Sequence, residues 1–144
     1  MAAGFADLEG ALQRLKDGAD SAAHDAAGAA AAVITRGVQL ELSRSSHARG
    51  TKTPAAPGQP PSLITGQLRR SVRMTRLDRT GTGQWTAHVA PTTVYSRIQE
   101  LGGVAGKGHR SRLPPRPYVR PAFQMWQLKA YDAAVAAFRR SSGL

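Results

Sequence analysis

Side chains that could carry out catalysis or bind a metal are few in this sequence, and their spacing suits neither task. Zinc sites on helices need histidines about three to five positions apart, often beside other ligands. The histidines here are scattered, and no carboxylate cluster accompanies them. The absence of cysteine excludes disulfides, thiolate catalysis and cysteine-based zinc or iron–sulfur centres. We therefore expect only structural roles for His24, His47, His88 and His109.

Signatures of phosphate binding and hydrolysis are also incomplete. Gly106-Lys107 matches two positions of a phosphate-binding loop, but Leu101 stands where its first glycine belongs and Gly108 where Ser or Thr belongs. No G-x-S-x-G nucleophile elbow is present. The acidic residues form no obvious pair for acid–base catalysis. The sequence predicts a protein that is not an enzyme and uses no cofactor, unless a cleft assembles distant residues.

The composition indicates one small, basic domain, residues 1–144. Lys and Arg number 20 against 9 Asp and Glu, which gives a net charge of +11. Such a charge favours nucleic acid or an acidic protein face as a partner, with a solvated basic surface as the plainer alternative. Aromatic residues make up only 6% and much of the apolar fraction is alanine. We expect a thin core and alanine-rich helices that partner subunits help to cover.

Neither secretion nor membrane insertion is indicated. The first residues lack a basic region and carry acids early, so no signal peptide is expected. The run 26–34 is too short and too weakly apolar to cross a bilayer. The sequence predicts a soluble protein of a reducing cytoplasm, without a membrane partner.

The elements that would position these side chains begin with helices. Phe5, Leu8, Leu12 and Leu15 recur at helical spacing, which predicts a short amphipathic helix ending near residues 17–18. A second, longer helix would follow, with Asp20 or Ser21 as its N-cap and an alanine-rich stripe reaching Leu42. Gly28 and Gly37 would weaken that helix by about 1 kcal/mol each, so a packed neighbour must offset the cost.

The middle of the chain predicts an extended arm and a hairpin. Residues 47–63 are rich in proline and favour an extended arm with polyproline II character, or a plain linker. A short helix over 66–72 leads into strands near 72–77 and 85–91, joined by a turn over 78–83. The alternation of apolar and polar residues slips at Arg76-Leu77, which leaves the register there open.

The last third predicts one or two helical turns over 94–101, a flexible, basic, glycine-rich loop over 102–116 and a final helix from near Pro121 to about Arg140. The predicted fold class is α+β: N-terminal helices, a small antiparallel sheet with a short helix, the extended arm, the loop, and a C-terminal helix packed on the sheet. The apolar face of the final helix would be Phe123, Trp126, Ala130, Ala134, Ala137 and Phe138.

Three ordered segments are the most distinctive: 57–61 with 65–71, 95–102, and 116–122. In this order, with helical regions on either side, they resemble the neck and tail-completion proteins of long-tailed phages, also described as head-to-tail joining or minor tail proteins. The resemblance covers roughly residues 5 to 140. The family's usual Glu-Phe-Gly is Glu100-Leu101-Gly102 here and its usual Pro-Phe is Pro117-Tyr118, and both changes keep apolar bulk.

The residues of these segments also have structural interpretations of their own. Thr65 would cap the short helix, and Gly66 would allow a tight turn into it. We expect Leu68 to point inward and Tyr95 to pack on the sheet. Gly102 would end the helix before it, and Tyr118 would anchor the next segment in the core. Pro117 and Pro121 would hold the backbone extended.

Charged residues near the segments are candidates for subunit or partner contacts. Glu100 is an acid in a basic neighbourhood. It would form either a salt bridge within its chain or, as we slightly favour, an intersubunit bridge to Arg116 or Arg120. The remaining candidates are Arg69, Arg70, Arg73, Lys107, Arg110 and Arg112.

The resemblance implies a virion protein at the head-to-tail junction, made in the cytoplasm of a bacterial host. It would form a ring, with six subunits favoured over twelve, around the DNA channel. Its partners would be a head-closure (stopper) or adaptor protein and a tail terminator or tail tube protein, with only non-specific contact to DNA. A tail-terminator role is the alternative within the class. A free basic nucleic-acid-binding protein, tracking phosphates with arginines 69–79, is the alternative outside it.

Overall fold

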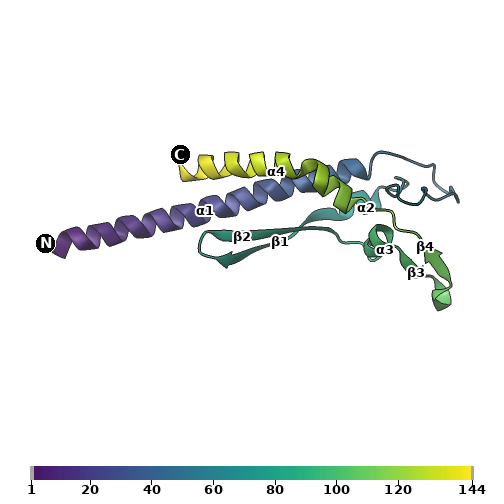
Figure 1. Cartoon of the computed structure of the whole chain (residues 1–144), viewed down its shortest axis with the longest axis horizontal. Helices are drawn as coiled ribbons and strands as arrows, with labels where there is room; N and C mark the ends of the chain where they lie inside the picture. Colours follow the sequence, from purple (N-terminus) through teal and green to yellow (C-terminus); the bar gives the residue numbers. More distant parts are fainter. Residues whose placement is uncertain (1, 144) are drawn as a thin grey trace.

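The computed structural model describes the backbone of residues 2–143 and the side chains of residue 5 and residues 7–143. The ends of the predicted domain, Met1 and Leu144, lie outside the described residues. Figure 1 shows a long helix, α1 (Ala2–Glu41), with a second helix, α4 (Val119–Ser142), along one side of it and a β-hairpin along another. The mixed α+β fold class is confirmed.

The N-terminal segment is one helix of 40 residues, so the predicted break near residues 17–18 is wrong. Gly18 costs a helix interior only about 1 kcal/mol, which the turns on either side tolerate. Asp20, a predicted N-cap, has another role. Its carboxylate accepts hydrogen bonds from Arg79 Nε at 3.0 Å and from the backbone amide of Gly83 at 2.9 Å, and so ties the hairpin to α1.

The main hairpin pairs β1 (Val72–Gly81) with β2 (Gln84–Pro91), directly after the short helix α2 (Gln67–Ser71). The first strand runs further than predicted, and only two residues are left for the turn because Gly83 adopts a φ of 65°. The register shifts between Met74 and Arg76, which leaves one unpaired residue at the place where the sequence alternation slips.

The predicted flexible loop over 102–116 is instead a small antiparallel hairpin. It follows α3 (Ser96–Leu101) and consists of β3 (Gly103–Ala105), the 3₁₀ turn η1 (Lys107–His109) and β4 (Ser111–Leu113). Gly106 and Gly108 have φ of 80° and 73°, conformations that let this chain reverse within a few residues. Glycine content here supports a tight turn, not a lack of structure. We call this hairpin the basic tip.

The extended arm over residues 47–63 lies back on its own chain. The amides of His47 and Leu63 bond to the carbonyls of Leu63 and Ser45, and the amide of Gly58 bonds to Pro115 at 3.0 Å. Pro60 is buried. The arm has neither a helix nor a named strand, as predicted, but three separate points of it are fixed.

The core lies between α1, α4 and the start of β1, and it is small. Its buried members are mostly aliphatic, with Tyr118 as the one aromatic ring that is fully buried. Trp126 covers Gly37, where an added Cβ would lie 2.6 Å from the indole ring. This is the packed neighbour that the sequence required. The buried cluster is Ile34, Val38, Leu42, Val72, Tyr118, Ala122 and Ala130.

Candidate functional site

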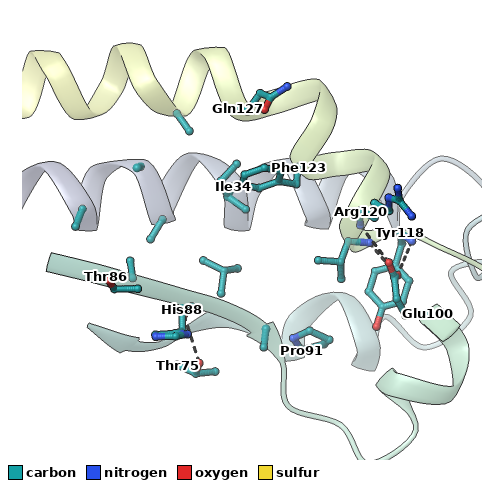
Figure 2. A pocket seen from close by; sticks show the side chains of 18 of the residues that line it. Ile34, Thr75, Thr86, His88, Pro91, Glu100, Tyr118, Arg120, Phe123 and Gln127 are labelled. Carbon is teal, nitrogen blue, oxygen red and sulfur yellow. Dashed lines mark hydrogen bonds between the residues drawn. The ribbon is translucent and has the colours of Figure 1, made fainter. Parts of the chain in front are cut away.

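The three distinctive segments meet at one joint, and Glu100 is at its centre. This residue is in the last turn of α3. One carboxylate oxygen accepts hydrogen bonds from the amides of Tyr118 at 2.7 Å and Val119 at 3.0 Å, and the other accepts from Arg120 at 3.1 Å (Figure 2). The first amides of a helix lack partners within the helix and lie at the positive end of its dipole. The carboxylate therefore caps α4 from a neighbouring element.

This geometry changes the interpretation of Glu100. Both of its oxygens bond to backbone amides of the same chain, and none of the ion pairs in the described residues joins it to the side chain of Arg116 or Arg120. The hypothesis of an intersubunit bridge rests on the expectation that a single acid among arginines forms an ion pair with one of them. A structural role in starting α4 accounts for the acid without a second subunit.

Tyr118 anchors the joint in the core, as predicted. Its ring has no exposed surface, and its hydroxyl donates a hydrogen bond to the carbonyl of Ser96 at 3.2 Å. Burial, together with the negative charge of Glu100, raises the pKa of the Tyr118 hydroxyl well above its ordinary value. This side chain stays neutral and fixes α4 against α3.

Arg116 was predicted to contact a partner, and the structure contradicts this. The residue is only 5% exposed. Its Nε donates to the carbonyl of Ala55 at 2.9 Å, and its amide bonds to Gln99 at 2.7 Å. Its charge therefore holds the extended arm against α3. A buried guanidinium needs such acceptors, and an arm of exposed carbonyls supplies them.

Gly102 ends α3, as predicted, and no other residue fits there. Its φ is 71°, and an added Cβ would lie 2.8 Å from both the Leu113 carbonyl and the Pro115 nitrogen. At the other end of the joint, Gly66 rather than Thr65 occupies the N-cap of α2, with φ of 72°. The Thr65 hydroxyl lies 3.4 Å from the Gln67 amide, too far for a good cap.

Other motif residues divide between the core and the surface. Leu68 packs against the core as expected. Tyr95, predicted to pack on the sheet, is the N-cap of α3 and is 36% exposed, and it lines a small hollow with Leu68 and Gln99. The prediction of extended backbone at Pro121 is wrong: α4 begins at Val119, so Pro121 lies in its first turn, which does not need the missing amide. Pro117, directly before Tyr118, is half-buried.

The arginines over residues 69–79 do not form a continuous cationic row. Arg69 is half-buried and donates to the Ser43 hydroxyl at 3.2 Å. Arg76 pairs with Asp78 and Arg79 with Asp20, so acids neutralise both. Arg70 and Arg73 remain exposed, as does Arg120.

The basic tip is a positive surface made by one short hairpin. Lys107, Arg110 and Arg112 are all exposed, and no acid of the described chain pairs with them. Figure 1 shows the tip at the end of the molecule opposite the start of α1. It presents at least three cations from one short hairpin.

An apolar groove of ≈ 1120 Å³ beside the joint was not predicted. Its floor is the alanine-rich stretch of α1 ending at Ile34, and β2 forms one wall. α4 forms the other (Figure 2). Phe123 and Tyr131 line it and are 52% and 68% exposed. We call this hollow the apolar groove.

Phe123 marks where the sequence prediction of α4 fails. It was expected on the core face, but that face consists mainly of Ala122, Ala130 and Ala137 with Trp126 beside them. Small side chains let α4 approach α1 closely, which leaves a large ring to one side. The signal available in the sequence was the excess of alanine at helical spacing on both helices.

Comparisons with protein-family models, with curated proteins and with solved structures found no match. Among the described residues, no three potential ligands of the types His, Asp and Glu gather as a metal site. None of the described helices combines the length and apolar character needed to cross a membrane.

Proposed function

We propose that this protein is a structural subunit of a phage head-to-tail connector, a neck or tail-completion ring that joins the head-closure layer to the tail around the DNA channel. A tail-terminator role is the alternative within this class. The observation that carries the proposal is the set of three ordered segments that resemble this family. Their convergence on one joint supports it.

The joint explains why these particular segments are distinctive. Glu100 of the second segment caps the helix that the third segment begins. Arg116 of the third holds the arm that leads to the first, and Leu68 of the first packs in the core that contains Tyr118. Proteins that share a fold need the residues that hold its elements together. We therefore expect such residues to occur in the same order along each of their sequences.

The rest of the molecule is compatible with an assembly protein. Both long helices expose apolar side chains, and the core is thin. The basic tip suits non-specific contact with DNA phosphates or with an acidic partner face. Neither the exposed apolar side chains nor the basic tip implies a catalytic function.

Deletion of the gene from the phage or prophage that carries it tests this proposal. We expect DNA-filled heads and separate tails by electron microscopy, with joined particles restored by a plasmid copy. Joined, infectious particles without the protein would contradict the proposal. Immunogold labelling at the junction distinguishes a virion component from an assembly factor that leaves.

The basic tip also favours a second candidate, a free DNA-binding protein. Binding of the purified chain to duplex DNA across a salt series tests it. Each phosphate contact contributes roughly −0.9 to the slope of log K against log salt, so the double variant Arg110→Ala/Arg112→Ala would flatten the slope by about 2. Tight binding at physiological salt with this change would favour the second candidate. Weak binding would favour the connector.

A further inference from the structure

The first part of α1 projects from the rest of the molecule. Figure 1 shows it running beyond the end of α4 and beyond the hairpin turn. Among the described residues, the first bonds from α1 to another element are those of Asp20, and none of the side chains described over residues 5–19 is buried, so this stretch has no packed neighbour in the described part of its chain. We call these residues the projecting helix.

The projecting helix carries an uncovered apolar stripe. Phe5, Leu8, Leu12 and Leu15 follow the helical spacing i, i+3, i+7 and i+10, and their exposed fractions are 71%, 54%, 54% and 71%. Such anchors are the pattern by which an amphipathic helix enters a groove on a partner. An exposed apolar stripe of this kind marks a surface for contact with another molecule.

The apolar groove is the matching surface on the same chain. It is lined along α4 from Val119 to Tyr131, a length of about 18 Å at 1.5 Å per residue. The stripe from Phe5 to Leu15 has a length of about 15 Å by the same rise. The groove can therefore hold the whole stripe, and its apolar walls suit the leucines.

Charges support the same pairing. The first half of the projecting helix, up to residue 13, has two acidic side chains, Asp7 and Glu9, and no Lys or Arg; Arg14, Lys16 and Asp17 follow in its second half. Three charged side chains line the groove: Glu100, whose carboxylate is bonded to the amides at the start of α4, and Arg97 and Arg120, with which no acidic side chain of the described residues forms an ion pair. The acidic start of one chain thus complements the basic edge of another chain's groove.

A chain cannot fill its own groove. Ala27, Ala31 and Ile34 of α1 form part of the groove floor, and the projecting helix continues the same unbroken helix away from them. Reaching back would require breaking α1. Pairing of two stripes is less suitable, because only about two heptads are available, fewer than a stable coiled coil needs, and the groove would stay uncovered.

We infer that the projecting helix of one copy of this protein docks in the apolar groove of a second copy. The contact is heterologous, since the two surfaces differ, so its repetition closes a ring where the rotation between copies allows closure and otherwise gives an open filament; two reciprocal contacts give a dimer. The inference deepens the proposed function and rests on it only for closure into a ring. The docking itself follows from the two surfaces.

Sedimentation velocity of the full-length purified chain tests the docking. We expect wild type to self-associate, and both Leu8→Glu/Leu12→Glu and Phe123→Glu to weaken association at least ~100-fold. Leu128→Glu is the matched control, because Leu128 lies on α4 and is 75% exposed but does not line the groove. Circular dichroism would confirm that each variant keeps its helices. A monomeric wild type, or association unaffected by Phe123→Glu, would overturn the inference.

Mixing the two defective variants gives the sharper test. The groove variant still has a projecting helix, and the helix variant still has a groove, so one productive contact remains and a mixed dimer should form. Neither variant alone should dimerise. Failure of the mixture to associate would overturn the inference.

Cross-linking identifies the faces in contact, and the chain has no cysteine to interfere. Gln13→Cys marks the projecting helix and Gln127→Cys marks the groove. With a short bis-maleimide, the mixture should give a covalent dimer, and Gln13→Cys alone should give almost none. A strong dimer of Gln13→Cys alone would show stripe-to-stripe pairing and overturn the inference. A chain that docks in this way but is absent from virions would refute the proposed function and leave the docking intact.

Discussion

Glu100 shows how much one side chain contributes at the joint, because three backbone amides at the start of α4 depend on it. We expect Glu100→Ala to lower the free energy of unfolding by about 2–3 kcal/mol, since charged hydrogen bonds are lost and partly buried amides lose their acceptor. Glu100→Gln keeps one acceptor oxygen and should cost less. Urea denaturation measures both.

Glu9→Ala is the control for Glu100, because Glu9 is exposed on the projecting helix. It should change the free energy of unfolding by no more than about 0.5 kcal/mol. Arg120→Ala, also at an exposed position, should leave folding intact as well. If Glu100→Ala unfolds like wild type but fails to join heads to tails, the intersubunit role is restored and the capping role is minor.

Tyr118 makes stability depend on alkaline pH. Burial raises the pKa of its hydroxyl, so the folded state keeps a proton that the unfolded state releases above the ordinary tyrosine pKa of 10.0. The contribution is therefore full below pH 10.0 and is lost as pH rises above it, by up to about 1.4 kcal/mol per pH unit. Tyr118→Phe should remove this part of the slope. Equal slopes for the two proteins between pH 9 and pH 11 would contradict it.

The structural role of a single residue can be predicted where the local sequence determines it. Gly102 is predicted to stop a helix and Tyr118 to anchor the core, because a glycine that can adopt a positive φ and a large ring next to proline have local signatures. The backbone amides that Glu100 binds lie 18 or more positions away in the sequence. The carbonyl that the Arg116 side chain binds lies 61 positions away. No spacing rule connects such residues, so those roles require the folded chain.

At the scale of elements, α1 and α4 are held together by small residues. Gly37→Ala should lower the free energy of unfolding, although alanine favours helices, because its Cβ would lie 2.6 Å from the Trp126 ring. Gly28→Ala is the matched control: nothing lies within 4 Å of its Cβ position, so a gain of up to about 1 kcal/mol is expected. Thermal melts of both would measure the contrast. A gain for both would show that Trp126 moves without cost.

Asp20 fastens the hairpin turn to α1. The hydrogen bond from the Gly83 amide, with a smaller contribution from Arg79, lowers the pKa of the Asp20 carboxyl. The tether is therefore present above the ordinary aspartate pKa of 3.8 and is lost as pH falls below it. Asp20→Asn should speed hydrogen exchange at Gly83 while the core amides keep their protection. Unchanged exchange at Gly83 would show that the tether is not needed.

Most elements followed from the sequence, and two did not. The main hairpin, α3 and α4 have local periodicity or turn residues that predict them. The 40-residue α1 was divided wrongly, because Gly18 and Asp20 are normally signs of a helix end, and only the tertiary bond from Asp20 to the hairpin shows otherwise. The sequence of the basic tip predicts a flexible loop, because glycines serve both tight turns and flexible segments.

At the scale of the whole molecule, composition predicted a thin core and incompletely covered helices. It could not locate the apolar groove, since α1, β2, α3 and α4 must come together to line it. Nor could it show that the predicted first helix projects from the body. The projection depends on where α4 ends relative to α1, and the groove depends on how β2, α3 and the first half of α4 meet α1; both are tertiary properties.

The state of assembly should control the projecting helix. In Phe123→Glu, which leaves the stripe unoccupied, amides over residues 5–19 should exchange rapidly, because a short helix without packing opens readily. In self-associated wild type the same amides should be protected by at least ~100-fold. Exchange measured by mass spectrometry tests this. Equal exchange in the two proteins would mean that the stripe is not covered by association.

The unbroken course of α1 has a mechanical consequence for such an assembly. Leu15 of the stripe and Ala27 of the groove floor are separated by about 18 Å of continuous helix. That length fixes the spacing between the stripe and the groove floor, because a helix does not compress or fold over a dozen residues. Two added turns near Gly18 would push each copy further from the next while nearly preserving the face of the stripe. The number of residues between the stripe and the groove floor would therefore set the diameter of a ring built in this way.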